Sequence, residues 1–229
     1  MLNRLFKSFS RTLRALPAAG LACGISCSQA ASLPLPDPAV DPPPAAHTQN
    51  QTIVLAGGCF WGIQAVFQHV RGVSEAISGY AGGDAKTAAY DAVSSGTTGH
   101  AEAVKVTYDP AQITLGQLLK VYFSVAHNPT ELNRQGPDRG TQYRSGIFFT
   151  TPEQEKVATA YIDQLQKAGI FSAPIVTEVK PLPAFYPAED YHQNYATKHP
   201  VNPYIVINDL PKVVDLKNQF PSLYTDQVQ

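Results

Sequence analysis

A single cysteine in a glycine-rich turn is the residue of this 229-residue chain best suited to chemistry. Cys59 lies in residues 57–62, Gly-Gly-Cys-Phe-Trp-Gly, between an apolar run at 52–56 and apolar residues at helical spacing from Ile63 to Val70. These patterns predict a strand, a tight turn that the two glycines permit, and a helix that begins near the thiol. There the unpaired N–H groups and the helix dipole favour an anion and lower a thiol pKa. A small apolar residue packed under a turn is the alternative.

A glutamate on the most clearly predicted strand is the second candidate. Residues 100–108 alternate in character, and because successive side chains of a strand point to opposite faces, Glu102 shares one face with Val104 and Val106. Burial disfavours the charged form of a carboxyl group, so a buried Glu102 stays protonated near neutral pH and can act as a general acid. The alternative is a glutamate at the strand end that reaches solvent.

Two tyrosines and two further polar residues complete the set of candidates. Tyr90 and Tyr143 each combine an apolar ring with a donor hydroxyl, which suits hydrogen bonding to a substrate oxygen in a semi-apolar pocket. Asp138 and His192 are further candidates, although each of the four, taken alone, is more typical of an ordinary core or rim residue. The histidines, cysteines and carboxylates show no metal-ligand spacing, so no metal site is predicted.

The elements that must position these residues alternate between strands and helices. Strands are predicted at residues 52–56, 73–80, 100–108, 144–150 and 175–179. Helices are predicted after the cysteine, from a Thr114 cap, from Thr151-Pro152 to Gly169, and near residues 213–220. This order favours an α/β (α+β) fold: a two-layer sandwich with a mixed sheet, flanking helices and a long irregular C-terminal region.

Composition limits the partners and the number of domains. Hydrophobic residues make up 44% of the chain, charged residues 15%, and the net charge is −1, which gives no electrostatic reason to expect nucleic acid or an anionic membrane surface as a partner. The three cysteines cannot form a disulfide framework. Residues 31–50 are rich in proline and alanine, which is typical of an extended linker. Residues 51–229 are expected to form one domain.

The N-terminal residues have the layout of a secretory signal peptide. Residues 1–30 begin with basic residues and no acid, continue with an apolar run from Ala15 to Cys27, and end with small residues at 28–30. The run is too short to span a membrane stably. We therefore expect export, with the periplasm as destination. The alternatives are a mitochondrial transit peptide, or acylation of Cys23 or Cys27 as a membrane tether.

Several separated motifs resemble those of a known family. The motifs at residues 58–62, 99–102 (Gly-His-Ala-Glu) and 140–145 (Gly-Thr-Gln-Tyr-Arg-Ser) resemble the peptide-methionine (S)-S-oxide reductases, the A-type methionine sulfoxide reductases. The similarity runs from about Thr52 to Leu216. It implies a mixed α/β sandwich and an oxidoreductase that reduces the S epimer of methionine sulfoxide, free or in proteins, and so repairs oxidised proteins.

The resemblance also assigns a role to each candidate residue. Cys59 would be the nucleophile that attacks the sulfoxide sulfur and becomes a sulfenic acid. Glu102 would protonate the departing oxygen, to which Tyr90 and Tyr143 would donate hydrogen bonds. Two exposed aromatic residues, Phe60 and Trp61, would form the wall that holds the substrate methyl group. The residues that orient the backbone side of the substrate would be Asp138, His192 and Tyr195.

One departure from the family pattern affects how the thiol is recycled. Many family members carry a later cysteine that forms a disulfide with the oxidised nucleophile, but here Ile205 lies near that position and no cysteine follows Cys59. The chain therefore resembles a one-cysteine form with no bound cofactor, which an external thiol, thioredoxin-like or of low molecular weight, must reduce. Smaller departures are Asn128, where an aspartate is common, and Arg139 beside Asp138.

Two functions from other classes remain open at this point. A cysteine hydrolase would use Cys59 with His192 or His100 as its base. A binding module would recognise oxidised methionine without turnover, since the usual recycling cysteine is missing. The reductase has oxidised proteins or free methionine sulfoxide and a thiol reductant as its expected partners.

Overall fold

The computed structural model describes residues 34–44 and 49–228. The leader predicted at residues 1–30, with Cys23 and Cys27, lies outside the described residues. The described residues all belong to one compact unit. Within the described ranges, no helix is both long enough and apolar enough to cross a bilayer.

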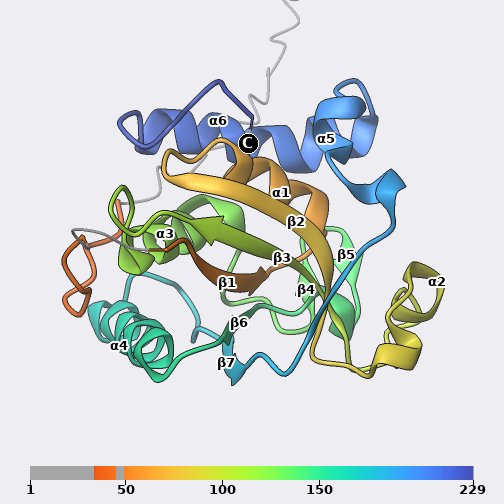
Figure 1. Cartoon of the computed structure of the whole chain (residues 1–229), viewed down its shortest axis with the longest axis horizontal. Coiled ribbons are helices and arrows are strands. Elements are labelled where there is room, and N and C mark those ends of the chain that lie inside the picture. The colour runs from red at the N-terminus through yellow and green to blue at the C-terminus, as the bar shows by residue number, and fades with distance from the viewer. Residues whose placement is uncertain (1–33, 45–48, 229) are drawn as a thin grey trace, which may run out of the picture. The chain divides into compact units, whose positions relative to one another are not determined.

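A six-stranded sheet forms the centre of this unit, in the order β7-β6-β1-β3-β2-β8 (Figure 1). Its strands are β1 (Gln51–Ala56), β2 (Val73–Ala81), β3 (Ala101–Tyr108), β6 (Gly146–Phe149), β7 (Glu178–Pro181) and β8 (Phe185–Pro187). β6 and β7 run parallel, whereas the other neighbouring pairs are antiparallel. A separate two-stranded ribbon joins β4 (Arg134–Gln135) to β5 (Asp138–Arg139). The predicted mixed sheet is confirmed.

Helices connect and cover the strands. The α-helices of the described residues are α1 (Phe60–Gln68), α2 (Tyr90–Val93), α3 (Leu115–Val121), α4 (Pro152–Ala168), α5 (Tyr195–Lys198) and α6 (Leu210–Gln219). Two π-helical segments, Tyr122–Ala126 and Ile205–Asp209, adjoin α3 and α6. Thr114 caps α3 through a capping box with Gln117, and Gly169 ends α4 in the left-handed conformation. Both helix boundaries agree with the sequence-based prediction.

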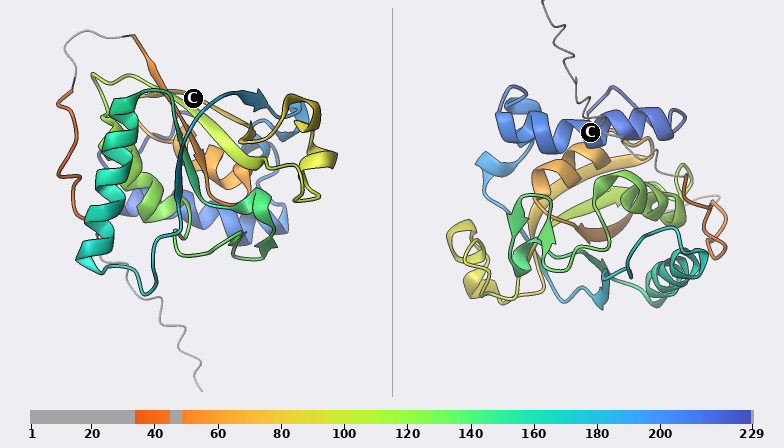
Figure 2. Two further views of the ribbon diagram at one scale, coloured as in Figure 1. Left: turned by 90° about the horizontal axis from the view of Figure 1, so that it is seen from below. Right: turned by 180° about the vertical axis from the view of Figure 1, so that it is seen from behind.

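One face of the sheet carries nearly all of the apolar core. Val104, Val106 and Tyr108 of β3 pack there with residues of α1, α3 and α4. Ala103 of the same strand lies in a small cluster on the opposite face. α1 and α3 lie behind the sheet in Figure 1 and in front of it in the right-hand view of Figure 2. The alternation predicted for β3 and the two-layer architecture are therefore confirmed.

The predicted strand boundaries are wrong where contacts between residues distant in sequence determine the backbone hydrogen bonding. β7 begins at Glu178 rather than at residue 175, because the Val176 N–H donates to the Pro129 carbonyl at 2.8 Å, outside the sheet. β8 was not predicted, since three residues paired with the edge of β2 leave no readable alternation. Tyr90 begins a short helix, α2, which was not among the predicted helices.

Residues 34–44, which we term the N-terminal strap, are extended but lie against the domain. Leu35 is buried in the main core. The Asp41 carboxylate accepts hydrogen bonds from the Gly116 N–H at 3.0 Å and from the Thr114 hydroxyl, at the start of α3. The linker expected from composition is therefore fixed to a helix over this range.

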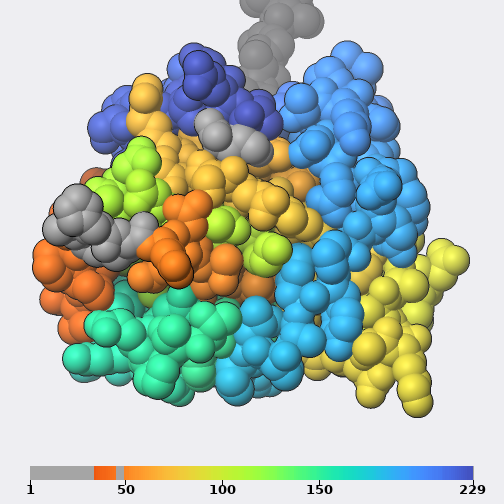
Figure 3. Space-filling view, viewed as in Figure 1, coloured from red at the N-terminus to blue at the C-terminus, as the bar shows by residue number. Residues whose placement is uncertain are grey.

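The strap also crosses α4. The Tyr161 hydroxyl donates to the Pro36 carbonyl at 2.9 Å. The Gln164 side chain accepts from the Ala39 N–H and donates to the Asp37 carbonyl, both at 2.8 Å. Figure 3 shows the strap as an orange-red band along the left edge of the molecule, above α4. Its backbone groups are thus paired with side chains of a helix more than 120 residues further along the chain.

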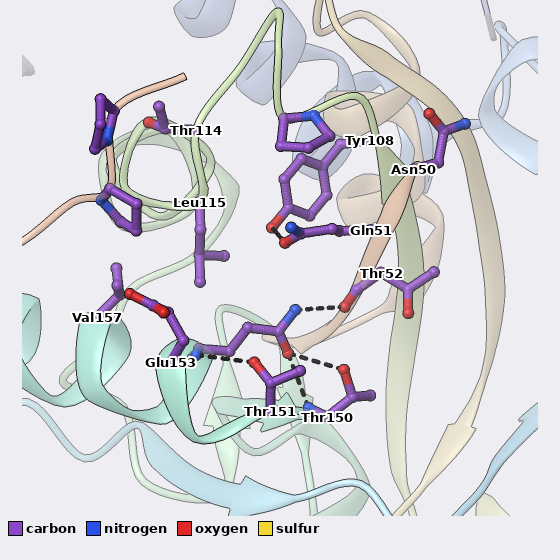
Figure 4. A pocket seen from close by; sticks show the side chains of 14 residues that line it. Asn50, Gln51, Thr52, Tyr108, Thr114, Leu115, Thr150, Thr151, Glu153 and Val157 are labelled. Atoms are coloured by element: carbon purple, nitrogen blue, oxygen red, sulfur yellow. Dashed lines mark hydrogen bonds between the residues drawn. The ribbon is translucent and has the colours of Figure 1, made fainter. Parts of the chain in front are cut away.

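A cavity of about 580 Å³ lies beside the strap (Figure 4). Pro42 and Pro43 line it together with residues of β1, β3 and α4. Within its wall the Tyr108 hydroxyl donates to the Gln51 side chain at 2.9 Å. None of its lining residues belongs to the set predicted to do chemistry.

We expect Asp41→Ala to lower the free energy of unfolding by about 1–2 kcal/mol, because it removes a carboxylate acceptor from the first turn of a helix. Urea denaturation followed by circular dichroism measures the change. Asp37→Ala is the matched control: the Asp37 side chain is 89% exposed and forms only a surface ion pair with Lys120. Equal effects of the two substitutions would contradict a structural role for Asp41.

Candidate active site

Cys59 is the N-cap residue of α1 and directly follows the glycine turn. Gly58 has a φ of +91°, which glycine adopts without steric cost. A Cβ on Gly57 would lie 2.8 Å from the His127 Cβ, and one on Gly58 would lie 2.6 Å from the Gln135 Cβ. The turn therefore needs glycine both for its conformation and for its close approach to two side chains.

A buried histidine network supports that turn. His127 Nδ1 lies 3.1 Å from the Tyr122 carbonyl oxygen, and Nε2 lies 2.8 Å from the Ser145 hydroxyl. Burial lowers the pKa of His127 to about 3, so the ring is neutral at physiological pH. Because Nδ1–H donates to the carbonyl, Nε2 accepts from Ser145. Ser145 also lies 2.6 Å from the Thr177 hydroxyl, which fixes the network on both sides.

Glu102 is buried and linked directly to the first turn of α1. It lies near the start of β3, is 2% exposed, and accepts a hydrogen bond from the Phe60 N–H at 3.1 Å. Burial raises the pKa of Glu102 to about 8, against the Phe60 N–H, which favours the charged form. The carboxyl group is thus protonated at pH 7 beside the residue that follows Cys59. The alternative of a solvent-exposed glutamate is wrong.

The thiol of Cys59 does not have the lowered pKa that its helical position predicts. Burial raises its pKa well above the usual value, and the charges of Glu102 and Asp209 raise it further. The Trp61 backbone N–H and the charge of Lys212 act in the opposite direction. The expected effect of the helix terminus is therefore present but smaller than the cost of desolvating the thiolate.

The two candidate tyrosines face the same centre. Tyr90 lies at the start of α2, and Tyr143 lies in a short 3₁₀ turn, Thr141–Tyr143. Burial raises the pKa of both phenols, and the negative charges of Glu102 and Cys59 add to the shift in each case. Both hydroxyls therefore stay protonated at physiological pH, and each is close enough to Cys59 and Glu102 for their charges to act on it.

Glu189, which the sequence analysis did not select, positions Tyr90. Its carboxylate accepts from the Tyr90 N–H at 2.9 Å and from the Tyr80 hydroxyl at 2.8 Å. α2 has only four residues, and its N-cap Ala89 offers no side-chain acceptor. Glu189 therefore supplies from 99 residues away the cap that the local sequence lacks.

Trp61 brings together most of the predicted substrate-binding residues. Its ring stacks on Tyr195 with centroids 3.7 Å apart, and its Nε1–H donates to His192 Nδ1 at 3.2 Å. Tyr204 lies edge-on to Trp61 at 5.9 Å and donates from its hydroxyl to Asp138. Tyr204 is a further residue that the sequence analysis missed, although it directly precedes the position examined for a second cysteine.

Phe60 differs from its prediction, because it is fully buried rather than exposed. Its ring packs 5.9 Å from Tyr80 and 5.0 Å from His192. Only Trp61 of the two aromatic residues is partly exposed. Phe60 thus supports the site from inside the core, and Trp61 faces its surface.

Neither histidine proposed as a hydrolase base is hydrogen-bonded to the thiol, although His192 Nε2 has no hydrogen-bond partner among the described residues. His100 accepts from the Gly83 N–H at 3.2 Å, and its Nε2 lies 3.0 Å from the Asp84 carbonyl oxygen. His192 Nδ1 accepts from Trp61. The hydrogen bonds found among the described residues include none between a histidine and the Cys59 thiol. The same residues contain no group of three side chains able to hold a metal ion.

Comparison with known proteins decides between the remaining alternatives. A family model described as peptide methionine sulfoxide reductase matches residues 51–223. The chain belongs to this family. It is 60% identical over 178 residues to "Peptide methionine sulfoxide reductase MsrA 2" of Mesorhizobium japonicum, covering 78% of this chain and 91% of that relative. It is 53% identical to the protein of the same name from Synechocystis sp., covering 81% and 88%.

Solved structures of the family share the fold. The reduced form of Mxr1 from Saccharomyces cerevisiae is 34% identical, with a TM-score of 0.60 over 72% of this chain and 92% of that one. Methionine sulfoxide reductase A of Corynebacterium diphtheriae is 36% identical, with a TM-score of 0.59 over 70% and 84%. The protein is therefore an oxidoreductase that reduces methionine sulfoxide, and the comparisons favour neither the hydrolase nor the binding module.

The lowered pKa of His127 makes stability depend on pH. Because its pKa is about 3 in the fold and about 6.5 in the unfolded chain, the unfolded chain binds more protons between these values. The contribution of His127 is complete above pH 6.5 and is lost as the pH falls toward 3. His127→Asn should flatten this dependence by up to about 1.4 kcal/mol per pH unit.

Urea denaturation at several pH values, repeated for wild type and variant, measures that difference. His199→Asn is the control, since His199 lies outside the network. A variant with the same pH slope as the wild type would contradict the role of a neutral His127.

Glu189→Ala should lower the reductase rate about tenfold or more, because displacement of a positioned group by an ångström is that costly. Glu189→Gln retains an acceptor oxygen and should retain more activity. Steady-state rates with a methyl sulfoxide substrate test both variants, and Glu153→Ala, on the exposed side of α4, controls for general effects. Equal rates in Glu189→Ala and wild type would exclude the positioning role.

Proposed function

We propose that Cys59 is the nucleophile and Glu102 the general acid in the reduction of methionine (S)-sulfoxide, free or in proteins. The observation that carries this proposal is the hydrogen bond of 3.1 Å between the Phe60 N–H and the buried carboxyl of Glu102. It places a group that is protonated at pH 7 next to the only thiol among the described residues.

The reaction transfers one oxygen atom and two electrons. The Cys59 Sγ attacks the sulfoxide sulfur while Glu102 gives its proton to the departing oxygen. The protonated oxygen then passes from the substrate sulfur to Sγ while the new sulfur–sulfur bond breaks, so that methionine leaves with that electron pair and Cys59 becomes a sulfenic acid. Tyr90 and Tyr143 donate hydrogen bonds to the oxygen as it gains negative charge. Their raised pKa values keep both hydroxyls protonated during this step.

Substrate binding uses the surface around Trp61. Trp61, stacked on Tyr195, offers an apolar surface to the methyl group of the substrate. Phe60 supports this surface from the core. Asp138 and His192 orient the backbone side of the substrate.

Recycling requires a thiol from outside the chain. Ile205, near the position of a second cysteine in many relatives, is fully buried and packs with Ala65 and Ala196. A first external thiol attacks the sulfenic acid, releases water and forms a mixed disulfide with Cys59. A second thiol then displaces Cys59 and restores it. A thioredoxin-like protein supplies both thiols in one molecule, and a small thiol supplies them in two encounters.

The leader proposed at residues 1–30 directs the enzyme out of the cytoplasm, to the periplasm. The basic start, apolar run and small residues before residue 31 support this proposal. N-terminal sequencing of the mature protein tests it: a first residue between about 28 and 34 is expected. An intact Met1, or acylation at Cys23 or Cys27, would overturn cleavage at that site.

We expect Cys59→Ser to abolish formation of methionine, and Glu102→Gln to lower the single-turnover rate about 10²–10⁴-fold at pH 7. The loss should be largest below pH 8, where wild-type Glu102 carries its proton, and should shrink above that pH. Methionine released without added reductant measures the rate, with Glu75→Gln as the exposed control. Use of the separated S and R epimers tests stereospecificity. An unchanged rate in Glu102→Gln would remove this carboxyl from the mechanism.

A further inference from the structure

A buried ion pair from the C-terminal region lies against the first turn of α1. Asp209 is fully buried, and its Oδ1 lies 3.2 Å from Nζ of Lys212, whose side chain is 23% exposed. A Cβ on Gly62 would lie 2.1 Å from that oxygen and 2.6 Å from that nitrogen. Any side chain at this position would displace the pair. Gly62 is therefore the residue that lets both charges approach the helix.

The location of Gly62 puts the pair beside the thiol. Cys59 is the N-cap of α1 and Gly62 its third helical residue. Residues three apart lie on the same side of a helix, and the Trp61 N–H of this first turn acts on the Cys59 thiol. An ammonium group against Gly62 thus lies at the side of the helix terminus that the Cys59 thiol occupies.

The Asp209–Lys212 ion pair is unfavourable for the stability of the fold. Asp209 Oδ2 is buried and has no hydrogen-bond partner among the described residues. The desolvation of a buried carboxylate with one unpaired oxygen is unfavourable, and a single ion pair does not generally compensate for it. Burial accordingly raises the pKa of Asp209, against the charge of Lys212. An apolar residue of similar size would stabilise this segment better.

We propose that Lys212, held against α1 by Asp209, is a positioning residue that stabilises the thiolate of Cys59. This inference rests on the proposed function of Cys59 as nucleophile. The other titratable groups at this centre are Glu102 on β3, Asp138 on β5 and three tyrosines, Tyr90, Tyr143 and Tyr204. Of the charged groups that act on the thiol, Lys212 is the cation, and its charge opposes those of Glu102 and Asp209.

A one-cysteine enzyme depends on this thiolate twice. Cys59 first attacks the sulfoxide sulfur. Later, when the second external thiolate attacks the mixed disulfide, the sulfur–sulfur bond breaks and its electron pair stays on Cys59 Sγ. A better-stabilised thiolate is a better leaving group, so the same cation favours both steps. Lys212 lies on the segment that follows Ile205, where no second thiol is present.

The test is the pH dependence of Cys59 alkylation by iodoacetamide in the whole protein, followed by mass spectrometry of the peptide that contains Cys59. Only the thiolate reacts, so the profile reports its apparent pKa. Lys212→Met should raise this pKa by about one unit. At a pH below the pKa, the alkylation should then be roughly tenfold slower than in the wild type. Lys212→Arg should restore the wild-type profile. Asp209→Asn keeps an oxygen that can accept from the Lys212 ammonium and removes a negative charge, so it should lower the pKa.

Lys217→Met is the matched control, since Lys217 lies on the same helix, is 58% exposed and pairs with Asp226. Its profile should equal that of the wild type. A wild-type profile in Lys212→Met would overturn the inference, and because Lys212 is partly exposed this variant decides the matter even where Asp209→Asn does not fold. Alkylation needs no sulfoxide, so methionine formation by Cys59→Ser would reject the proposed function without changing this result.

Discussion

The hydrogen bond between the Phe60 N–H and Glu102 joins the two halves of the site. It connects the first turn of α1 to the start of β3, 42 residues further along the chain. A strand that faces the core on one side carries the carboxyl group into a buried position. There the Phe60 N–H, which has no partner within its helix, donates a hydrogen bond to it. The N–H favours the charged form, yet burial still raises the pKa of Glu102 to about 8. The contact therefore orients the carboxyl group of Glu102, the proposed acid, without removing its proton.

Burial acts on the proposed acid, Glu102, and on the proposed nucleophile, Cys59, with opposite consequences for the pKa that each role needs. A protonated carboxyl is what proton donation to an oxygen requires, so desolvation helps Glu102. A protonated thiol is a poor nucleophile, so the same desolvation opposes Cys59. Because the Phe60 contact holds the two groups together, greater solvent exposure would favour the thiolate of Cys59 but would also favour loss of the Glu102 proton. Local dipoles and charges, from the Trp61 N–H and Lys212, are what remain to favour the thiolate.

Sequence patterns predicted the parts of the fold that local rules control. Thr114 and Gly169 were found because caps leave a local signature, and the inward face of β3 was found because strands alternate. The same alternation placed Glu102 correctly in the core. Motif resemblance then gathered Trp61, Asp138, His192 and Tyr195, whose contacts span more than 60 residues and leave no periodic trace. Glu189 was not predicted, because it caps a helix 99 residues earlier and no local sequence pattern links the two. The burial of Phe60 and the packing of the strap were not predicted either, since composition does not show which surface a segment packs against.

Gly62 shows how one position can combine fold and chemistry. Within a helix, glycine lowers stability relative to alanine by roughly 1 kcal/mol, so its presence in the first turn of α1 needs a reason. Backbone conformation does not supply one, because Gly62 is helical and has no positive φ. The reason is space: Asp209 and Lys212 occupy the volume of the missing side chain. Three features here each lower stability: a glycine inside a helix, a fully desolvated carboxylate and a carboxylate oxygen without a hydrogen-bond partner. Together they allow a cation to lie against this turn. None of these features would stabilise a helix whose role was only to pack. Several destabilising features at one position are what a functional constraint produces.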